Sequence, residues 1–293
     1  MSCAANGDGG AATWAREPYA QGMPAAEELT GQRVTVDIHD QIAYVRLTRA
    51  DKLNGLDFAM LEQLVAAART VRADRAVRAV ILLGDGSSFS SGLDFASVMS
   101  KPGQVARAFV RLPWRPTNLF QRVCWEWRTM PVPVLAVLHG HCYGGGMQIA
   151  LAADFRFATP DCSLAIMEAK WGIIPDMTAS VTLRELVGAD VAKRLVMTGE
   201  TFDGREAHRL GLVTEVADDP LAEAERLAAA LATRSPDSVA AAKKLLNRTR
   251  TLPARAALRA ERSLQLGLLR GANSKTARAA AMAGKTPQFK PRR

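Results

Sequence analysis

The stretch VLAVLHGHCYGGG, residues 134–146, joins a run of five apolar residues directly to a turn that is rich in glycine. Five consecutive apolar residues that end in such a turn predict a strand buried on both faces of a sheet. The residues that follow, 147–153, are mostly apolar, and we expect them to form a helix. A strand, a glycine turn and a helix in this order are typical of an α/β fold.

A second stretch, earlier in the chain, has the same plan. The run AVILL at 79–83 predicts another buried strand, and the small residues of FSSGLD at 89–94 follow it. Small residues let a ligand approach the backbone closely, and N–H groups at the start of a helix favour an anion. Side by side, the two loops would form an oxyanion hole, which stabilises charge developing on a carbonyl. The alternative is tight packing of each strand against its helix; neither loop has a nucleotide-binding glycine motif.

Outward from these stretches, the pattern continues to predict strands and helices. Apolar residues alternate over 34–47, which predicts a β-hairpin, and Asp57 is placed to cap a helix with apolar residues from Met60 to Ala68. The sheets of such a fold are covered on both faces. Beyond Pro220 only helical patterns occur, over 221–233, 238–247, 254–269 and 275–283. We therefore expect a flexible extension at 1–30, an α/β core with the active site at 31–219, and a helical, basic region at 220–293.

Composition excludes two classes of protein. Of the 293 residues, 48% are hydrophobic and 23% are charged, and no apolar run approaches the ~18 residues of a membrane span. An integral membrane protein and a wholly disordered one are both excluded. The four cysteines, at 3, 124, 142 and 162, form no Cys-x-x-Cys pair, and the first residues lack the pattern of a signal peptide. We expect reduced thiols in a cytoplasmic protein.

The basic residues are concentrated at the C-terminal end. The net charge is +9, yet residues 243–293 hold fourteen Lys or Arg against a single acid, Glu261. A basic tail of this kind indicates nucleic acid, an acidic membrane surface or an anionic small ligand. A solvated helix face would explain the same composition.

A third segment, IMEAKWGIIPD at 166–176, places two carboxylates in a largely apolar stretch. Apolar surroundings raise the pKa of a carboxyl group towards neutral pH, as a general acid or base requires. Glu168 and Asp176 are therefore candidate catalytic residues. A surface ion pair of Glu168 with Lys170 or Lys193 is the alternative.

Five motifs together resemble the crotonase superfamily of enoyl-CoA hydratases and isomerases. They are KLNGL at 52–56, FSSGLD at 89–94, Gly140 with the glycines at 144–146, Glu168 through GIIP at 172–175, and AHRLGLV at 207–213. The similarity covers about residues 34 to 290 and closes on KTPQFK at 285–290. It implies a crotonase-like spiral of ββα units, with a C-terminal helical region that mediates trimers, often stacked into hexamers.

The resemblance also implies which residues bind the substrate. The oxyanion donors would be the N–H groups of Leu93 and Gly145, which would hold the thioester oxygen of an acyl-CoA. The coenzyme A moiety would be met by Lys52, Ser91, Gly92, Asp94 and Gly144, and its phosphates by basic residues near Lys290 from the same or a neighbouring subunit. Coenzyme A is then part of the substrate, and we expect no separate cofactor.

The chain departs from the hydratases of that family at one catalytic position. Where those enzymes carry a glutamate that pairs with the equivalent of Glu168, this chain has Gln148. An amide cannot take up a proton near neutral pH, so hydration by two carboxylates is incomplete. Asp176 coincides with an acid of the family's dienoyl-CoA isomerases. We therefore favour a double-bond isomerase in which Glu168 and Asp176 transfer the proton.

Other functions stay open at this point. They are a hydratase in which Glu168 is the sole catalytic carboxylate, an RNA-binding homologue and a non-catalytic acyl-CoA binder. The tail has only Phe289 for base stacking, which disfavours RNA. No metal site is expected at His139 and His141, and no nucleophilic serine at Ser90 or Ser91. The aromatic residues that would line either the acyl chain or the core are Phe109, Trp114, Phe120, Trp125 and Trp127.

Overall fold

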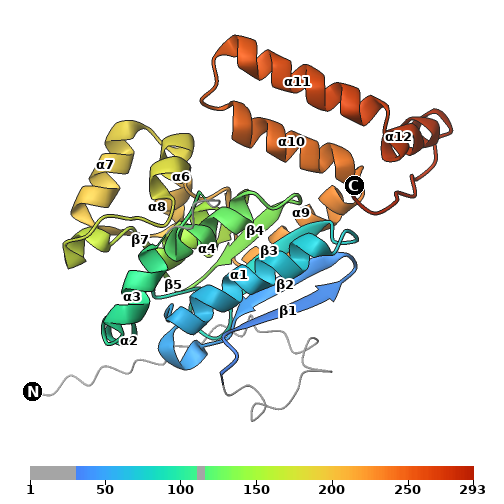
Figure 1. The fold of residues 1–293 in the computed structure, drawn as a ribbon. Coiled ribbons are helices and arrows are strands. Elements are labelled where there is room, and N and C mark those ends of the chain that lie inside the picture. The colour runs from blue at the N-terminus through green and yellow to red at the C-terminus, as the bar shows by residue number, and fades with distance from the viewer. Residues whose placement is uncertain (1–30, 111–115) are drawn as a thin grey trace, which may run out of the picture. The chain divides into compact units, whose positions relative to one another are not determined.

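The computed structural model describes residues 31–110 and 116–293, and in them a six-stranded sheet carries the fold (Figure 1). The strand order is β1-β2-β3-β4-β6-β9; β1 and β2 are antiparallel, and all other neighbours are parallel. The bounds are β1 Val34–His39, β2 Ile42–Leu47, β3 Ala79–Gly84, β4 Val134–Leu138, β6 Phe155–Ala158 and β9 Glu215–Val216. The predicted hairpin and both predicted buried strands are thus confirmed. The predicted extension at 1–30 and Trp114 lie outside the described residues.

A second, three-stranded sheet lies next to the glycine turns. It consists of β5 His141–Tyr143, β7 Ser163–Ala165 and β8 Thr201–Phe202, in the order β5-β7-β8. An isolated parallel bridge pairs Ser90 with Cys142 of β5. The segment after β3 therefore runs alongside the segment after β4.

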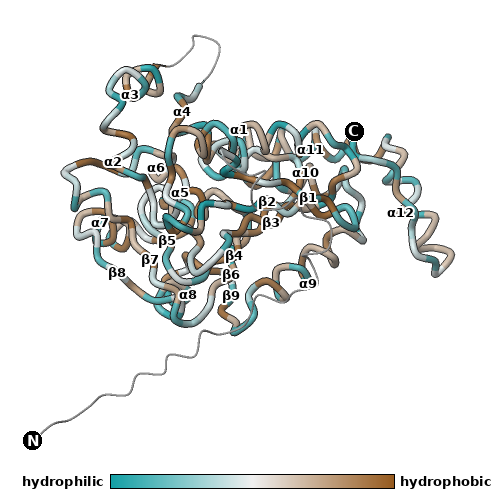
Figure 2. Tube along the Cα trace, turned by 90° about the horizontal axis from the view of Figure 1, so that it is seen from below, coloured by the Kyte–Doolittle hydropathy of each residue, from teal (hydrophilic) through white to brown (hydrophobic). Residues whose placement is uncertain are grey.

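Both faces of the large sheet are buried, as expected for an α/β fold. In β3, Val80 and Leu82 belong to one hydrophobic cluster, whereas Ala79, Ile81 and Leu83 belong to another. Helix α1 (Phe58–Ala73) packs in the first cluster and helix α9 (Pro220–Ala232) in the second. Figure 2 shows these two helices on opposite sides of the strands. Helix α9 thus covers the sheet, although the sequence placed it in the C-terminal helical region.

Local signals set several helix ends. The side chain of Asp57 accepts a hydrogen bond from the N–H of Met60 at 2.8 Å, which caps α1 as predicted. Helix α5 (Gly145–Leu151) begins two residues before the predicted Met147, because Gly144 turns the chain with φ +48° directly before it. The other helices that precede α9 are α2 Phe95–Met99, α3 Pro102–Phe109, α4 Leu119–Arg128, α6 Ala179–Leu186, α7 Ala189–Thr198 and α8 Gly204–Arg209, and there are two short 3-10 turns, η2 Ala50–Lys52 and η3 Glu168–Trp171.

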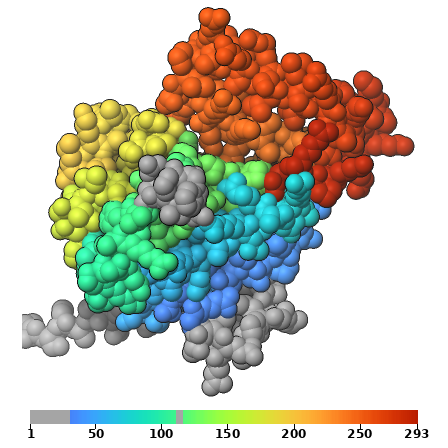
Figure 3. Space-filling view, in the orientation of Figure 1, coloured from blue at the N-terminus to red at the C-terminus, as the bar shows by residue number. Residues whose placement is uncertain are grey.

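Three further helices end the chain: α10 Pro236–Thr249, α11 Ala254–Leu269 and α12 Ala272–Met282. Figure 1 shows α10 and α11 as an antiparallel pair. A cavity of about 870 Å³ is lined by residues of α4, α6 and these helices. In Figure 3 the C-terminal helices, orange to red, border green parts of the chain. Among the described residues, no helix is long and apolar enough to cross a membrane.

Part of the basic tail has a structural role. Lys243 of α10 donates to Asp154 at 2.6 Å and to the carbonyl oxygens of Trp127 and Val132, so it ties α10 to the sheet. Arg292 is buried and donates to the carbonyl oxygens of Arg72 and Asp74 at the end of α1. These two cations therefore bond to groups inside the protein.

Candidate active site

The two loops that the sequence predicts to lie together are neighbours in the structure. The N–H of Ser90 donates to the carbonyl of His141 at 2.9 Å, and the N–H of Tyr143 donates back to Ser90 at 3.0 Å. Gly92 has φ +89°, and a Cβ added there would lie 2.8 Å from the Tyr143 carbonyl oxygen. Only glycine permits both this backbone conformation and this close approach of the loops.

Two backbone N–H groups at this junction lack a partner among the described residues. Leu56 bonds on either side of Leu93: its N–H donates to Gly92 at 2.8 Å, and its carbonyl accepts from Asp94 at 3.1 Å. The N–H of Leu93 itself donates to none of the described groups. Gly145 is the first residue of α5, so its N–H has no carbonyl within the helix, and it too has no other partner in this part of the chain. Both N–H groups are therefore available to an anionic oxygen.

Glu168 lies buried beside these glycines. It begins the 3-10 turn η3 with 7% of its surface exposed, and a Cβ added at Gly144 would lie 3.5 Å from its Oε1. Oε1 accepts a hydrogen bond from Nε2 of Gln148 at 2.6 Å. The other carboxylate oxygen, Oε2, is buried and has no hydrogen-bond partner in the described chain. Glu168 thus presents one free oxygen for proton transfer.

Gln148 is held at both ends of its amide. Its Oε1 accepts from the N–H of Met177 at 2.8 Å, while its Nε2 donates to Glu168. Since a backbone N–H only donates, this contact fixes which end of the amide faces Glu168. The next residue, Thr178, has φ +76°, a strained value for a β-branched side chain. The turn from Asp176 to Thr178 is thereby fixed next to Glu168.

The environment shifts the pKa of both carboxylates upward. Burial raises the pKa of Glu168, and the charge of Asp176 raises it further. A backbone hydrogen bond and the hydrogen bond from Gln148 lower it, but the net shift is upward. Burial also raises the pKa of Asp176. Among the described residues Glu168 forms no ion pair, so a surface pair with Lys170 or Lys193 does not explain its position. The pair is suited to exchange protons with a bound molecule.

The residues expected to meet coenzyme A are divided between two places. Lys52 is exposed at the end of η2, and its carbonyl accepts from the Ser91 hydroxyl at 3.4 Å, so Lys52 lies beside the loop at 89–94. Lys290 lies elsewhere: its carbonyl bonds to Asn273 and Arg78. Arg78 directly precedes β3, whereas the loop follows β3. Within one chain, the backbone of Lys290 is therefore at the opposite end of that strand from the loop, and its contact with coenzyme A stays a prediction.

Several other candidates have structural partners. His139 contacts the Gly86 carbonyl at 3.1 Å, and His141 contacts the Ser88 hydroxyl at 2.9 Å. Neither belongs to a metal-binding group within residues 31–110 and 116–293. The Ser90 hydroxyl donates to the Asn54 carbonyl and is buried. Phe120 and Trp127 are buried in the core, whereas Phe109 is exposed.

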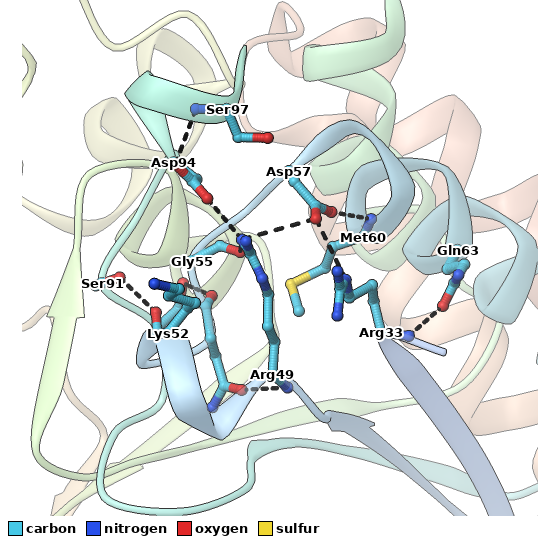
Figure 4. Close-up of polar contacts among 12 residues, drawn as sticks. Arg33, Arg49, Lys52, Gly55, Asp57, Met60, Gln63, Ser91, Asp94 and Ser97 are labelled. Carbon is cyan, nitrogen blue, oxygen red and sulfur yellow. Dashed lines mark hydrogen bonds and ion pairs between the residues drawn. The ribbon is translucent and has the colours of Figure 1, made fainter. Parts of the chain in front are cut away.

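One residue beside the site has no counterpart in the sequence-based predictions. Arg49 is buried, and its guanidinium donates to Asp94 at 2.8 Å, next to Leu93 (Figure 4). A lone arginine three residues before Lys52 gives no signal of burial, because its acidic partner lies 45 positions further along the chain.

Comparisons with known proteins agree on one family. The family model described as enoyl-CoA hydratase/isomerase matches residues 37–292. A probable enoyl-CoA hydratase of Bacillus subtilis is 33% identical over 210 residues, which is 71% of this chain and 79% of that protein. A mitochondrial Delta(3,5)-Delta(2,4)-dienoyl-CoA isomerase of Dictyostelium discoideum is 29% identical, over 70% of this chain and 73% of that one. The crystal structure of a protein described as an enoyl-CoA hydratase from Streptomyces coelicolor superposes with a TM-score of 0.81 at 30% identity, covering 94% of this chain and all of that one.

Proposed function

Because the chain belongs to the enoyl-CoA hydratase/isomerase family, we propose that it moves a carbon–carbon double bond along the acyl chain of an acyl-CoA thioester. The reaction passes through an enolate. The oxygen of the thioester carbonyl lies between the N–H groups of Leu93 and Gly145, whose lack of other partners supports this assignment. Donors fixed in advance at the place where negative charge develops lower the barrier most.

The proton moves between carbon and the two carboxylates. Oε2 of Glu168 takes a proton from the carbon next to the carbonyl, and the electron pair of that C–H bond forms the enolate double bond while the oxygen takes the negative charge. The electrons then return, the original double bond shifts, and protonated Asp176 gives its proton to the far carbon. Glu168 ends protonated and Asp176 ionised, and exchange with water restores both. The raised pKa values of both groups support these roles.

The contact of Gln148 with Glu168 is the observation that carries isomerisation over hydration. Hydration by two carboxylates needs a second proton carrier at position 148, and an amide cannot serve as one. The second ionisable group close enough to affect Glu168 is Asp176. Isomerisation needs a base and an acid, and these two residues supply them.

A hydratase is the second candidate. Gln148 Nε2 next to Glu168 would also orient a water molecule, with Glu168 acting as both base and acid, and the Bacillus subtilis relative carries the name of a hydratase. An RNA-binding role has less support, since Lys243 and Arg292 of the basic tail are engaged inside the protein. A non-catalytic acyl-CoA binder would not need a buried carboxylate with a free oxygen.

Two features support proposals about the oligomeric state of the protein and its cellular compartment. Helices α10 and α11 expose large apolar side chains that a homotrimer or hexamer would cover: Leu246, Leu258, Leu266 and Leu269. The described cysteines are buried and unbonded, which fits a reducing compartment such as the cytoplasm. The reaction proposed here uses no cofactor besides the coenzyme A of the substrate.

Purified protein incubated with 2-enoyl-, 3-enoyl- and 3,5-dienoyl-CoA tests the proposal, with hydration and bond migration followed separately. Bond migration should exceed hydration. Glu168→Gln and Asp176→Asn should each lower kcat by ~10²–10⁴, the usual value of general acid–base catalysis, with acyl-CoA still bound. The exposed Glu62→Gln of α1 is the matched control. Activity within twofold of wild type in Glu168→Gln would remove Glu168 from the mechanism, and predominant hydration would favour the second candidate.

A further inference from the structure

A buried arginine lies between two helix-capping carboxylates beside the loop at 89–94. Nη1 of Arg49 is 2.8 Å from Oδ2 of Asp94 and 3.7 Å from Oδ2 of Asp57 (Figure 4). The arginine side chain is 10% exposed, and the carboxylates are 21% and 12% exposed. An ion pair with this degree of burial is screened far less by water and salt than one on the surface.

Each of the two carboxylates begins a helix. Asp94 accepts from the N–H of Ser97 at 3.1 Å and caps α2, while Asp57 accepts from the N–H of Met60 and caps α1. Burial alone would raise the pKa of Asp94, but the Ser97 N–H and the Arg49 guanidinium lower it, and the net shift is downward. Arg49 therefore joins the starts of two helices that are far apart in sequence.

The same guanidinium also bonds to the segment that pairs with Leu93. Nη1 donates to the carbonyl oxygen of Gly55 at 2.9 Å, and the next residue, Leu56, forms the two hydrogen bonds on either side of Leu93. Arg49 thus holds the residue before Leu56 and the residue after Leu93. With both sides of this short bridge fixed, the Leu93 N–H is directed away from Leu56 and left without a partner among the described residues.

We propose that Arg49 is a positioning residue for the oxyanion hole: it fixes the Leu93 N–H in the direction that the enolate oxygen needs, without touching the substrate. This inference rests on the proposed function of the site. The guanidinium suits the task because its several N–H groups bond in one plane at fixed angles. Without the guanidinium, the carboxylates of Asp57 and Asp94 would repel each other. The repulsion would push Asp94, and with it the loop at 89–94, away from Leu56.

The test compares three variants of the full chain. Arg49→Met removes the bridge, and Arg49→Lys keeps the charge but not the planar set of donors. The control is Arg33→Met, because Arg33 also pairs with Asp57, at 3.2 Å, yet has no contact with Asp94. The probe is butyryl-CoA labelled with ¹³C at its carbonyl, a saturated acyl-CoA with no double bond to migrate. Its carbonyl stretch in the infrared falls on binding when the oxyanion donors polarise the bond.

The proposal predicts a smaller carbonyl shift in both Arg49 variants and an unchanged shift in Arg33→Met. In parallel, kcat on the best substrate should fall by about tenfold or more, while KM stays within about threefold. The fall should be smaller than the ~10²–10³-fold loss typical of deleting an oxyanion donor. A full carbonyl shift in Arg49→Met would overturn the proposal. Arg33→Met also weakens the start of α1, because Arg33 pairs with Asp57. Loss of the carbonyl shift in this variant would therefore indicate a general structural defect and would also overturn the proposal.

A second measurement does not depend on the substrate. Amide hydrogen exchange in the free protein should accelerate over residues 90–98 in the Arg49 variants, whereas Arg33→Met should affect only the start of α1. Unchanged exchange over 90–98 would contradict the proposal even if no acyl-CoA were bound. Failure of wild-type protein to bind butyryl-CoA would instead contradict the proposed function, so the two failures are distinct. If Arg49→Met does not fold, Arg49→Lys decides the outcome.

Discussion

Nε2 of Gln148 lies 2.6 Å from Oε1 of Glu168, so the side chain next to this buried carboxylate is a fixed donor that cannot take up a proton near neutral pH. Gln148→Glu would place a third carboxylate beside Glu168 and Asp176. Like charges at this distance raise each other's pKa values and disfavour the ionised base. We expect isomerisation to fall and its pH optimum to move upward, with little hydration gained.

The measurement is the pH profile of kcat for both reactions, with Gln265→Glu on the exposed side of α11 as control. A hydratase that lacks one carboxylate would respond in the opposite way, with hydration rising by ~10²-fold or more. A gain of that size without loss of isomerisation would rule out the isomerase assignment.

Glu168→Gln should make the protein more stable at neutral pH. Because burial raises the pKa of Glu168 in the folded state, the folded chain binds this proton more tightly than the unfolded chain does. The contribution of Glu168 to the free energy of unfolding is therefore fully present below its ordinary pKa of 4.5. It is lost as the pH rises through the pKa of the folded state. The glutamine carries no charge and avoids this loss.

Thermal unfolding of both proteins at pH 7 and at pH 4 measures the effect. The variant should have the higher Tm at pH 7, and the difference should shrink at pH 4, where the carboxyl of the unfolded chain is itself largely protonated. An equal or lower Tm of Glu168→Gln at pH 7 would show that burial of the charge is not destabilising.

Gly92→Ala should separate the two loops. A Cβ at this position would lie 2.8 Å from the Tyr143 carbonyl oxygen, and φ +89° is unfavourable for alanine. The loop must shift, and Leu93 with it, so we expect kcat to fall between about tenfold and ~10²-fold, the scale of a misplacement near 1 Å. The control is Gly103→Ala in α3, where an added Cβ has no neighbour within 4 Å. Wild-type kcat in Gly92→Ala would contradict the close packing of the loops.

Lys243→Met should destabilise the whole domain. The ammonium is 2.6 Å from Asp154, with its side chain only 8% exposed, and Asp154 also accepts from the N–H of Val134 in β4. Removing Lys243 leaves the Asp154 carboxylate, 20% exposed and still bonded to the Val134 N–H, without its cation, so the cost should be about 3 kcal/mol, the low end for a buried pair. The neighbouring Lys244 is exposed, so Lys244→Met should change stability by less than ~0.5 kcal/mol. Urea unfolding at one fixed protein concentration makes the comparison; equal midpoints for the two variants would refute the anchoring role of Lys243.

Features that depend on neighbours along the chain follow from the sequence. The apolar runs at 79–83 and 134–138 form strands of the main sheet, and Asp57 caps its helix, because burial of a run and capping of a turn involve residues a few positions apart. The glycines likewise indicate two loops that a ligand can approach. The apolar segment 166–176 predicts a raised pKa for Glu168, and burial in the structure shifts this pKa in the same direction.

The start of α5 shows the limit of local reasoning. The sequence placed it at Met147, but the chain already turns at Gly144, which has φ +48° and whose N–H donates to the carbonyl of Ala165 in β7, a residue distant in sequence. Lys290 is a second case: its position beside Arg78 depends on how the last residues pack across the molecule, so a basic tail alone does not say where its charges lie.

The sequence by itself determined the hairpin, the two buried strands, the capped start of α1, the two glycine loops and the presence of two carboxylates in an apolar segment. Only the tertiary structure decided that three polar groups beside the glycine loops have no partner among the residues described: the Leu93 and Gly145 N–H groups and Oε2 of Glu168. It also joined Gln148 to both Glu168 and Met177, and Arg49 to Asp94. The physical reason is range. Periodicity and capping act within one or two turns of chain, whereas the burial and pairing of a polar group are set by every segment that packs around it, however distant in sequence.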